Sequence, residues 1–271
     1  MINQAIPSQT ANWSLKGVIA RLAAQPSVQS VLIIGSLRHN ELTDDSDFDV
    51  VIVLDNLPQA WFVGVTQIDH RFTDLIFVNH TEIEHIHQLD APVANKHPLV
   101  PIIRWLQDGA LQFNRSPILE EVQAKVQTQP WVLSIDDTAV YEAWFSINYN
   151  LAQARRMAAS HNSLYQQVAA IRTAVYGHSD IWFGYFTMRK LAWAGDKTAV
   201  SYLQTHDPEF LAAYQQFITT TNLQDKMKAY ETAAIIATAP QGGLWPENAA
   251  VMNVMDTHSL WQQLIREDVS S

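Results

Sequence analysis

The sequence predicts an α/β domain with a mixed sheet, followed by an all-α helical-bundle domain. Strand-length apolar segments alternate with helical segments in the first half of the chain, as is typical of α/β domains. From Asp136 to Ala239 the hydrophobic spacing is helical, and no strand pattern interrupts it. We therefore expect a first domain over residues 1–130 and a helical domain over residues 131–271.

The first domain is expected to open with a helix and two buried strands. Residues 12–24 carry apolar side chains at helical spacing, and Pro26 ends this helix. Residues 28–34 form a strand that Gly35 ends, and residues 47–54 finish in an unbroken apolar run typical of burial on both faces. The next elements are a strand over 72–78, a helix over 99–107, a strand over 110–113 and a helix over 117–126.

The second domain is expected to consist of helices alone. The predicted helices cover residues 137–160, 164–176, 180–194, 197–205, 208–219 and 223–237. Gly177 and Gly195 are expected to separate three of them, and the Gly- and Pro-containing stretch 240–243 follows the last.

Composition limits what this protein does. A formal net charge of -10 argues against a long nucleic-acid partner, because Lys and Arg contacts with phosphates supply most of that affinity. The absence of cysteine excludes thiol catalysis, zinc–thiolate sites and disulfides. No apolar stretch approaches the roughly 20 residues of a membrane span, and residues 1–10 lack the features of a signal peptide. We expect a cytoplasmic protein that binds no membrane.

The stretch from Gly35 to Asp49 carries the chemistry. Gly35 and Ser36 directly follow a buried strand, where glycine lets the backbone approach a ligand and the turn offers hydrogen-bond donors to phosphate. Arg38 is a further candidate for contact with a phosphate oxygen. Asp47 and Asp49 lie two residues apart at the start of a strand, so we expect both side chains on one face. Two carboxylates this close repel one another unless cations lie between them, which favours magnesium.

This arrangement resembles the signature of the DNA polymerase β-like nucleotidyltransferase superfamily. The resemblance rests on Gly35-Ser36, nine intervening residues and then Ser46-Asp47-Phe48-Asp49, and it covers most of residues 15–128. It implies that the motif aspartates bind two Mg²⁺ ions, that the serines help to bind a nucleoside triphosphate, and that a third carboxylate lies on a neighbouring strand. Asp74, which opens an apolar strand, matches the third carboxylate better than Asp69 does.

The helical half is similar to the C-terminal domain of lincosamide and aminoglycoside nucleotidyltransferases. The similarity lies in residues 206–210, 214–217 and 223–231. It implies transfer of a nucleoside monophosphate, AMP from ATP, to a hydroxyl of a small molecule such as an aminoglycoside- or lincosamide-like antibiotic. Asp74 and Glu142 are the candidates for the base that takes the acceptor's proton.

Two other functions stay open at this point. One is an antitoxin-type nucleotidyltransferase that modifies a protein side chain, and the other is an inactive nucleotide-binding module. The long helical domain favours a small-molecule acceptor over a protein. The intact acids Asp47, Asp49 and Asp74 argue against an inactive module, because carboxylates that repel one another have no use without metal. A homodimer is compatible with the sequence.

Overall fold

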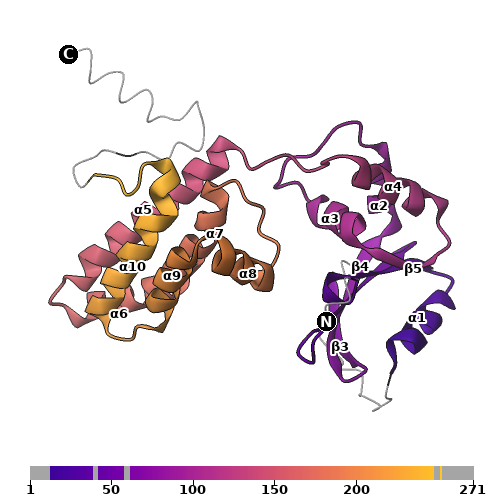
Figure 1. Cartoon of the computed structure of the whole chain (residues 1–271), viewed down its shortest axis with the longest axis horizontal. Coiled ribbons are helices and arrows are strands. Elements are labelled where there is room, and N and C mark those ends of the chain that lie inside the picture. Colours follow the sequence, from indigo (N-terminus) through magenta and orange to yellow (C-terminus); the bar gives the residue numbers. More distant parts are fainter. Residues whose placement is uncertain (1–12, 39–41, 58–61, 247–250, 252–271) are drawn as a thin grey trace. The chain divides into compact units, whose positions relative to one another are not determined.

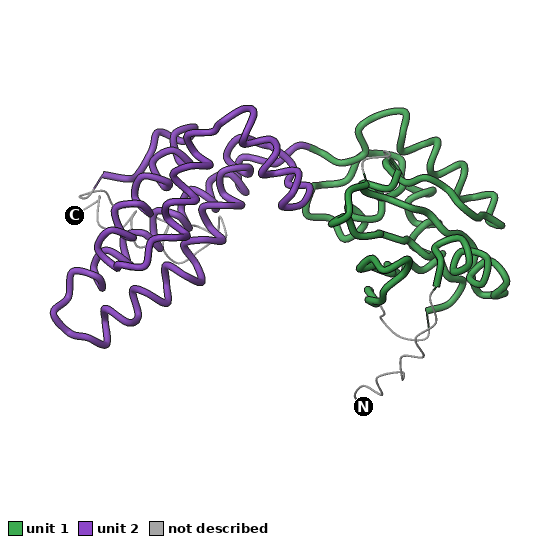
Figure 2. Tube along the Cα trace, turned by 60° about the horizontal axis from the view of Figure 1, so that its bottom comes forward, with its two compact units in different colours: residues 1–133 green, residues 134–271 purple. Residues whose placement is uncertain are grey.

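The computed structural model describes residues 13–38, 42–57, 62–246 and 251. The chain divides into two compact units, residues 1–133 and residues 134–271 (Figure 2). The boundary predicted from the sequence lies between residues 130 and 131. The first unit contains a sheet covered by helices, and the described part of the second unit is helical.

The first unit is built on a mixed five-stranded sheet in the order β3-β4-β2-β1-β5. The strands are β1 (Val28–Ile34), β2 (Phe48–Leu54), β3 (Val63–Ile68), β4 (Arg71–Asn79) and β5 (Ala110–Asn114). Strand β1 runs antiparallel to both β2 and β5, and β3 runs antiparallel to β4. Strands β2 and β4 are parallel. The predicted α/β fold with a mixed sheet is confirmed.

Helices cover both faces of this sheet. Helix α1 (Leu15–Ala23) lies on one face, and α2 (His80–Gln88), α3 (Val100–Asp108) and α4 (Pro117–Thr128) lie on the other (Figure 1). Alternate residues of β2 therefore point into two different cores. Val50 and Ile52 pack in the core under α1, whereas Val51 and Val53 pack against the three helices of the opposite face. Burial on both faces explains the unbroken apolar run of this strand.

Two elements of the first unit lie outside the predicted ones. Strand β3 is at the edge of the sheet, and Ile68 is its one buried residue. Helix α2 is mostly polar and buries Ile83 and Ile86. A capping box starts this helix: the side chain of Asn79 accepts from the N–H of Thr81, and Glu82 accepts from the N–H of Asn79.

The second unit is a bundle with one core of its own. Its α-helices are α5 (Asp137–Ala158), α6 (Ser163–Arg172), α7 (His178–Met188), α8 (Asp196–His206), α9 (Pro208–Thr219) and α10 (Leu223–Thr238). Tyr185, Phe210, Phe217 and Tyr230 are its largest fully buried side chains. The predicted helical character of this half is confirmed.

The prediction that Gly177 separates two helices is wrong. A π-helical turn, Thr173–Gly177, joins α6 to α7, and Gly177 has helical dihedral angles of φ −59° and ψ −44°. The residue is glycine because of packing. A Cβ at this position would lie 3.0 Å from Cζ of Tyr230 and 3.1 Å from Cζ of Phe217. The missing side chain lets two aromatic rings approach the helix. The conformational freedom of the Gly177 backbone is not used.

None of the helices in the described residues is both long enough and apolar enough to span a membrane.

Candidate active site

A tight turn follows strand β1. The turn is η1 (Gly35–Leu37), a single 3₁₀ turn. Gly35 has a φ of 71°, a left-handed conformation that favours glycine. A Cβ on Gly35 would lie 2.8 Å from Oδ2 of Asp49 on the neighbouring strand. Glycine is therefore required both for the direction of the turn and for the space that the Asp49 carboxylate occupies.

Asp49 and Asp74 lie side by side on one face of the sheet. The two residues are partners in the register of the parallel strands β2 and β4. On its other side Asp49 is paired with Ile34, the last residue of β1 before the turn. Alternation along β2 puts Asp49 on the same face as Val51, the face that α2, α3 and α4 cover farther along the strands. The turn at the end of β1, Asp49 on β2 and Asp74 on β4 thus follow one another across three neighbouring strands of the sheet.

Asp47 directly precedes strand β2. Strand β2 begins at Phe48, so strand alternation fixes the face of Asp49 and leaves that of Asp47 unspecified. Asp47 is exposed. Among the described residues, no group of three His, Cys, Asp or Glu side chains is arranged to hold a metal ion. The binding of metal by Asp47, Asp49 and Asp74 together stays a prediction, and of the three the structure makes Asp49 and Asp74 register partners.

The pair of carboxylates suits a magnesium ion in its ligand chemistry. Magnesium is commonly bound through one or two protein carboxylates, and substrate phosphates and water complete its coordination. Asp49 and Asp74 are both partly exposed, so a ligand on this face of the sheet can reach them. The donor set thus fits magnesium that arrives together with a nucleotide.

Arg38 is engaged in an ion pair. Its Nη1 lies 2.6 Å from Oδ1 of Asp108, the last residue of α3, and both side chains are partly exposed. For the predicted contact of Arg38 with a phosphate, the guanidinium would have to leave Asp108 or contact the phosphate and Asp108 together. Asp108 itself was not anticipated, because it lies far from Arg38 in the sequence.

Ser46 has a structural position in the loop before β2. Its side chain is buried, and its hydroxyl accepts a hydrogen bond from the N–H of Thr43 at 2.9 Å. Arg71, at the start of β4, donates to the carbonyl oxygens of Thr43 and Ser46. These bonds fix the loop that delivers the chain to Asp49. The predicted contact of Ser46 with nucleotide stays a prediction, and the part played by Arg71 left no signal in the sequence.

Glu142 belongs to the second unit. It lies in the second turn of α5 and is partly buried. Asp74, the other candidate base, lies in the first unit next to Asp49.

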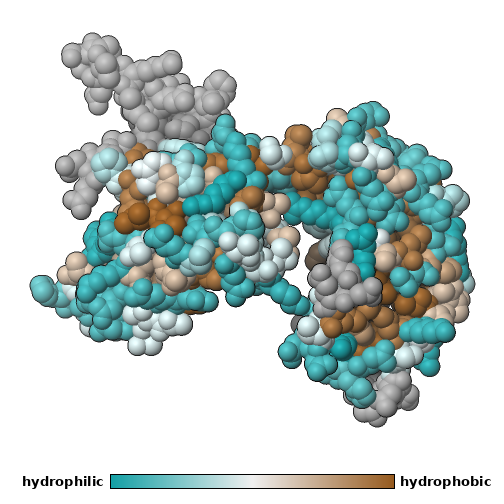
Figure 3. All heavy atoms as spheres, viewed as in Figure 1, coloured by the Kyte–Doolittle hydropathy of each residue, from teal (hydrophilic) through white to brown (hydrophobic). Residues whose placement is uncertain are grey.

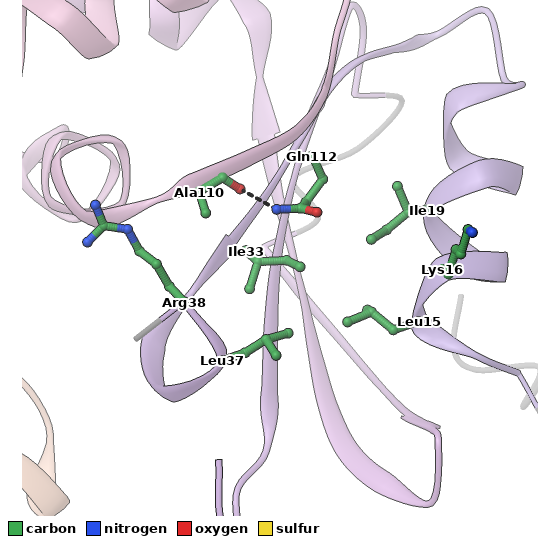
Figure 4. Close-up of a pocket in the computed structure, with 8 residues that line it drawn as sticks. All are labelled: Leu15, Lys16, Ile19, Ile33, Leu37, Arg38, Ala110 and Gln112. Carbon is green, nitrogen blue, oxygen red and sulfur yellow. Dashed lines mark hydrogen bonds between the residues drawn. The ribbon is translucent and has the colours of Figure 1, made fainter. Parts of the chain in front are cut away.

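A cavity of about 520 Å³ lies behind the turn. Leu15 and Ile19 of α1 point across it toward Ile33 and Leu37, whereas Arg38 extends away from its centre (Figure 4). Ile33 is paired with Val50, which packs in the core under α1. The cavity is therefore on the opposite face of the sheet from Asp49 and Asp74, and Arg38 is the predicted site residue that lines it.

The family that the sequence matches agrees with this geometry. Residues 15–112 match the nucleotidyltransferase domain family, and the match contains the turn, Asp49 and Asp74. No curated protein matches the sequence. Among solved structures, a nucleotidyltransferase-like protein from Exiguobacterium sibiricum 255-15 is 14% identical. That alignment covers 83% of this chain and 73% of the other, with a TM-score of 0.37.

Proposed function

We propose that this chain, whose residues 15–112 match the nucleotidyltransferase domain family, transfers AMP from ATP to a hydroxyl group of a small molecule. The observation that supports this most strongly is the register pair Asp49–Asp74 beside the Gly35 turn. A phosphate-binding turn next to two carboxylates is an arrangement suited to nucleotidyl transfer. It supplies donors for the phosphates and ligands for the divalent metal that accompanies them.

The first part of the proposal concerns the donor. Backbone N–H groups of the turn and the hydroxyl of Ser36 bind the phosphates, and the absence of a side chain on Gly35 allows a close approach. Asp49 and Asp74 would hold magnesium, which neutralises charge on the phosphates and on the leaving pyrophosphate when it is bound. Arg38 adds a positive charge at the end of the turn once it releases Asp108.

The second part concerns the transfer itself. An acceptor oxygen forms a bond to the α-phosphorus, and the bond from that phosphorus to the pyrophosphate oxygen breaks. Asp74 takes the proton of the acceptor hydroxyl as the general base. We prefer Asp74 to Glu142 because Asp74 is the register partner of Asp49. The products are an AMP ester of the acceptor and pyrophosphate.

The third part concerns the acceptor. A net charge of -10 attracts cationic molecules through the overall field of the protein. An amine-bearing antibiotic with free hydroxyls, such as an aminoglycoside or a lincosamide, meets this condition. The same field would disfavour a polyanionic acceptor such as RNA.

The experiment is a search for the adenylylated product. The protein is incubated with ATP and magnesium together with pooled aminoglycosides, pooled lincosamides or a cell lysate, and mass spectrometry records any added AMP. We expect AMP on a small molecule with the wild-type protein and none with Asp49→Asn. Asp90→Asn, which alters an exposed carboxylate outside the site, serves as the matched control.

Two results would contradict the proposal. AMP found on a protein band and on no small molecule would indicate a protein-modifying enzyme. Transfer that persists in Asp49→Asn would show that this carboxylate does not take part.

A further inference from the structure

The edge strand β3 exposes apolar side chains where polar ones are usual. Val63 and Val65 are 48% and 62% exposed, whereas Gly64 and Thr66 alternate with them on the other face. A strand with one solvated face normally directs polar residues to the solvent. Phe72, on the neighbouring strand β4, is also 54% exposed. Hydrophobic residues reaching the surface of the first unit are visible in the space-filling view (Figure 3).

These side chains lie next to Asp74. Val65 is the register partner of Asp74 in the antiparallel pair of β3 and β4. Residues directly opposite in such a pair have Cβ atoms about 4.5–5.5 Å apart and share a face of the sheet. Phe72 precedes Asp74 by two residues in the same strand, so it also shares that face. Val65 and Phe72 therefore flank the carboxylate on the face that carries Asp49.

The strand order places this apolar surface on the far side of the two carboxylates from the turn. The turn follows β1, Asp49 lies on β2, Asp74 on β4 and Val65 on β3, and these strands are consecutive neighbours in the sheet. In a transfer to phosphorus the attacking and leaving oxygens lie roughly in line. If the pyrophosphate is on the turn, the attacking hydroxyl comes from the far side of the carboxylates, where β3 lies.

We propose that Val65 and Phe72 form an acceptor platform that binds an apolar face of the acceptor next to its reacting hydroxyl. This inference rests on the proposed function and narrows it. The acceptor is a small alcohol with an aliphatic or aromatic surface beside the hydroxyl, which narrows the proposed antibiotic classes to members that carry such a surface. Phe62, 63% exposed and in ring contact with Trp105 at 6.1 Å between centroids, extends the apolar surface at the start of β3.

The first test measures binding without turnover. The probe is 4-fluorobenzyl alcohol, observed by ¹⁹F NMR line broadening with the full-length protein. We expect the wild-type protein to broaden the signal, and Val65→Ser and Phe72→Ser to weaken the broadening at least threefold. Val175→Ser is the matched control, because Val175 is 56% exposed in the second unit. Melting curves verify that each variant is folded.

The second test uses simple alcohols as acceptors. Ethanol, 1-butanol and 1-hexanol are supplied with ATP and magnesium, and the AMP esters are measured by mass spectrometry. In the wild-type protein we expect the yield to rise by up to about fourfold for each added CH₂ group that reaches the platform. In Val65→Ser and Phe72→Ser the rise with chain length should be clearly smaller.

The outcomes separate this inference from the proposed function. Probe binding that is lost in the two variants supports the platform even if no alcohol receives AMP, a result that would count against the transferase proposal alone. Equal probe binding by the wild-type protein and both variants would overturn the platform. A change of oligomeric state in Val65→Ser by size-exclusion chromatography, without a change in probe binding, would also overturn it in favour of contact between copies.

Discussion

Replacing Gly35 with alanine tests how closely the turn and the carboxylate fit together. Gly35 has a φ of 71°, and this left-handed region costs a residue with a Cβ about 1–2 kcal/mol. The added Cβ would also lie 2.8 Å from Oδ2 of Asp49, a distance that forces the carboxylate to move. We expect Gly35→Ala to lower the free energy of unfolding by at least about 1–2 kcal/mol, the cost of the left-handed backbone alone.

The effect on activity should exceed the effect on stability. A displacement of about 1 Å in a reacting or positioning group can cost about 100-fold in rate. We therefore expect magnesium-dependent pyrophosphate release from ATP, in the presence of an accepted alcohol, to fall by about 100-fold or more. Urea denaturation, monitored by tryptophan fluorescence, measures the stability of the same preparations.

Gly242→Ala is the matched control. Gly242 has a φ of 84°, and among the described residues nothing lies within 4 Å of the position that a Cβ would take there. This variant introduces the same kind of backbone strain without touching Asp49, so it should lose stability and keep its activity. A wild-type rate in Gly35→Ala, or equal losses of activity in the two variants, would refute the reasoning.

Three further predictions concern the carboxylates, the ligand and the helical unit. Asp49→Asn and Asp74→Asn should each abolish transfer. Their melting temperatures should stay unchanged or rise slightly, because neutralising one of two neighbouring carboxylates relieves the repulsion between them. A marked fall in melting temperature would contradict this reason. ATP with magnesium should stabilise the native state by about 2.7 kcal/mol at 100 times its Kd, and a chelator should remove most of the shift in melting temperature. Burial, with a smaller contribution from Lys226, lowers the pKa of His178 below its usual 6.5. As the pH falls, the unfolded state therefore binds more protons than the folded state does. The wild-type protein should therefore lose stability relative to His178→Gln between pH 7.5 and pH 5.5 in denaturation experiments, and a constant difference would count against the burial of this ring.

Local sequence patterns were sufficient to predict the buried strands and most helices. Strands β1 and β2 are apolar along their length because both of their faces are covered, and Pro26 and Gly35 delimit β1. Strand β3 has no such pattern, since its stability comes from hydrogen bonds to β4 and its exposed face carries valines. Helix α2 is mostly polar, and two isoleucines hold it against the core.

The candidate site was predictable where its residues are close together in the sequence. The Gly35-Ser36 turn and Asp49 belong to one short motif, and Asp74 follows from its position at an apolar strand. The register that makes Asp49 and Asp74 partners depends on which strands are neighbours, and a single sequence does not contain that order. For the same reason the pairing of Arg38 with a distant residue could not be predicted.

The most direct test of the central claim uses ATP that is radioactively labelled at either the α- or the γ-phosphate and measures which product carries the label. With [α-³²P]ATP and an accepted alcohol, the label should appear in the product, and with [γ-³²P]ATP it should appear in pyrophosphate. Asp49→Asn should transfer neither label. If the γ-label were found on the acceptor and the α-label remained in ADP, the protein would be a phosphotransferase, and nucleotidyl transfer at the Asp49–Asp74 site would be contradicted.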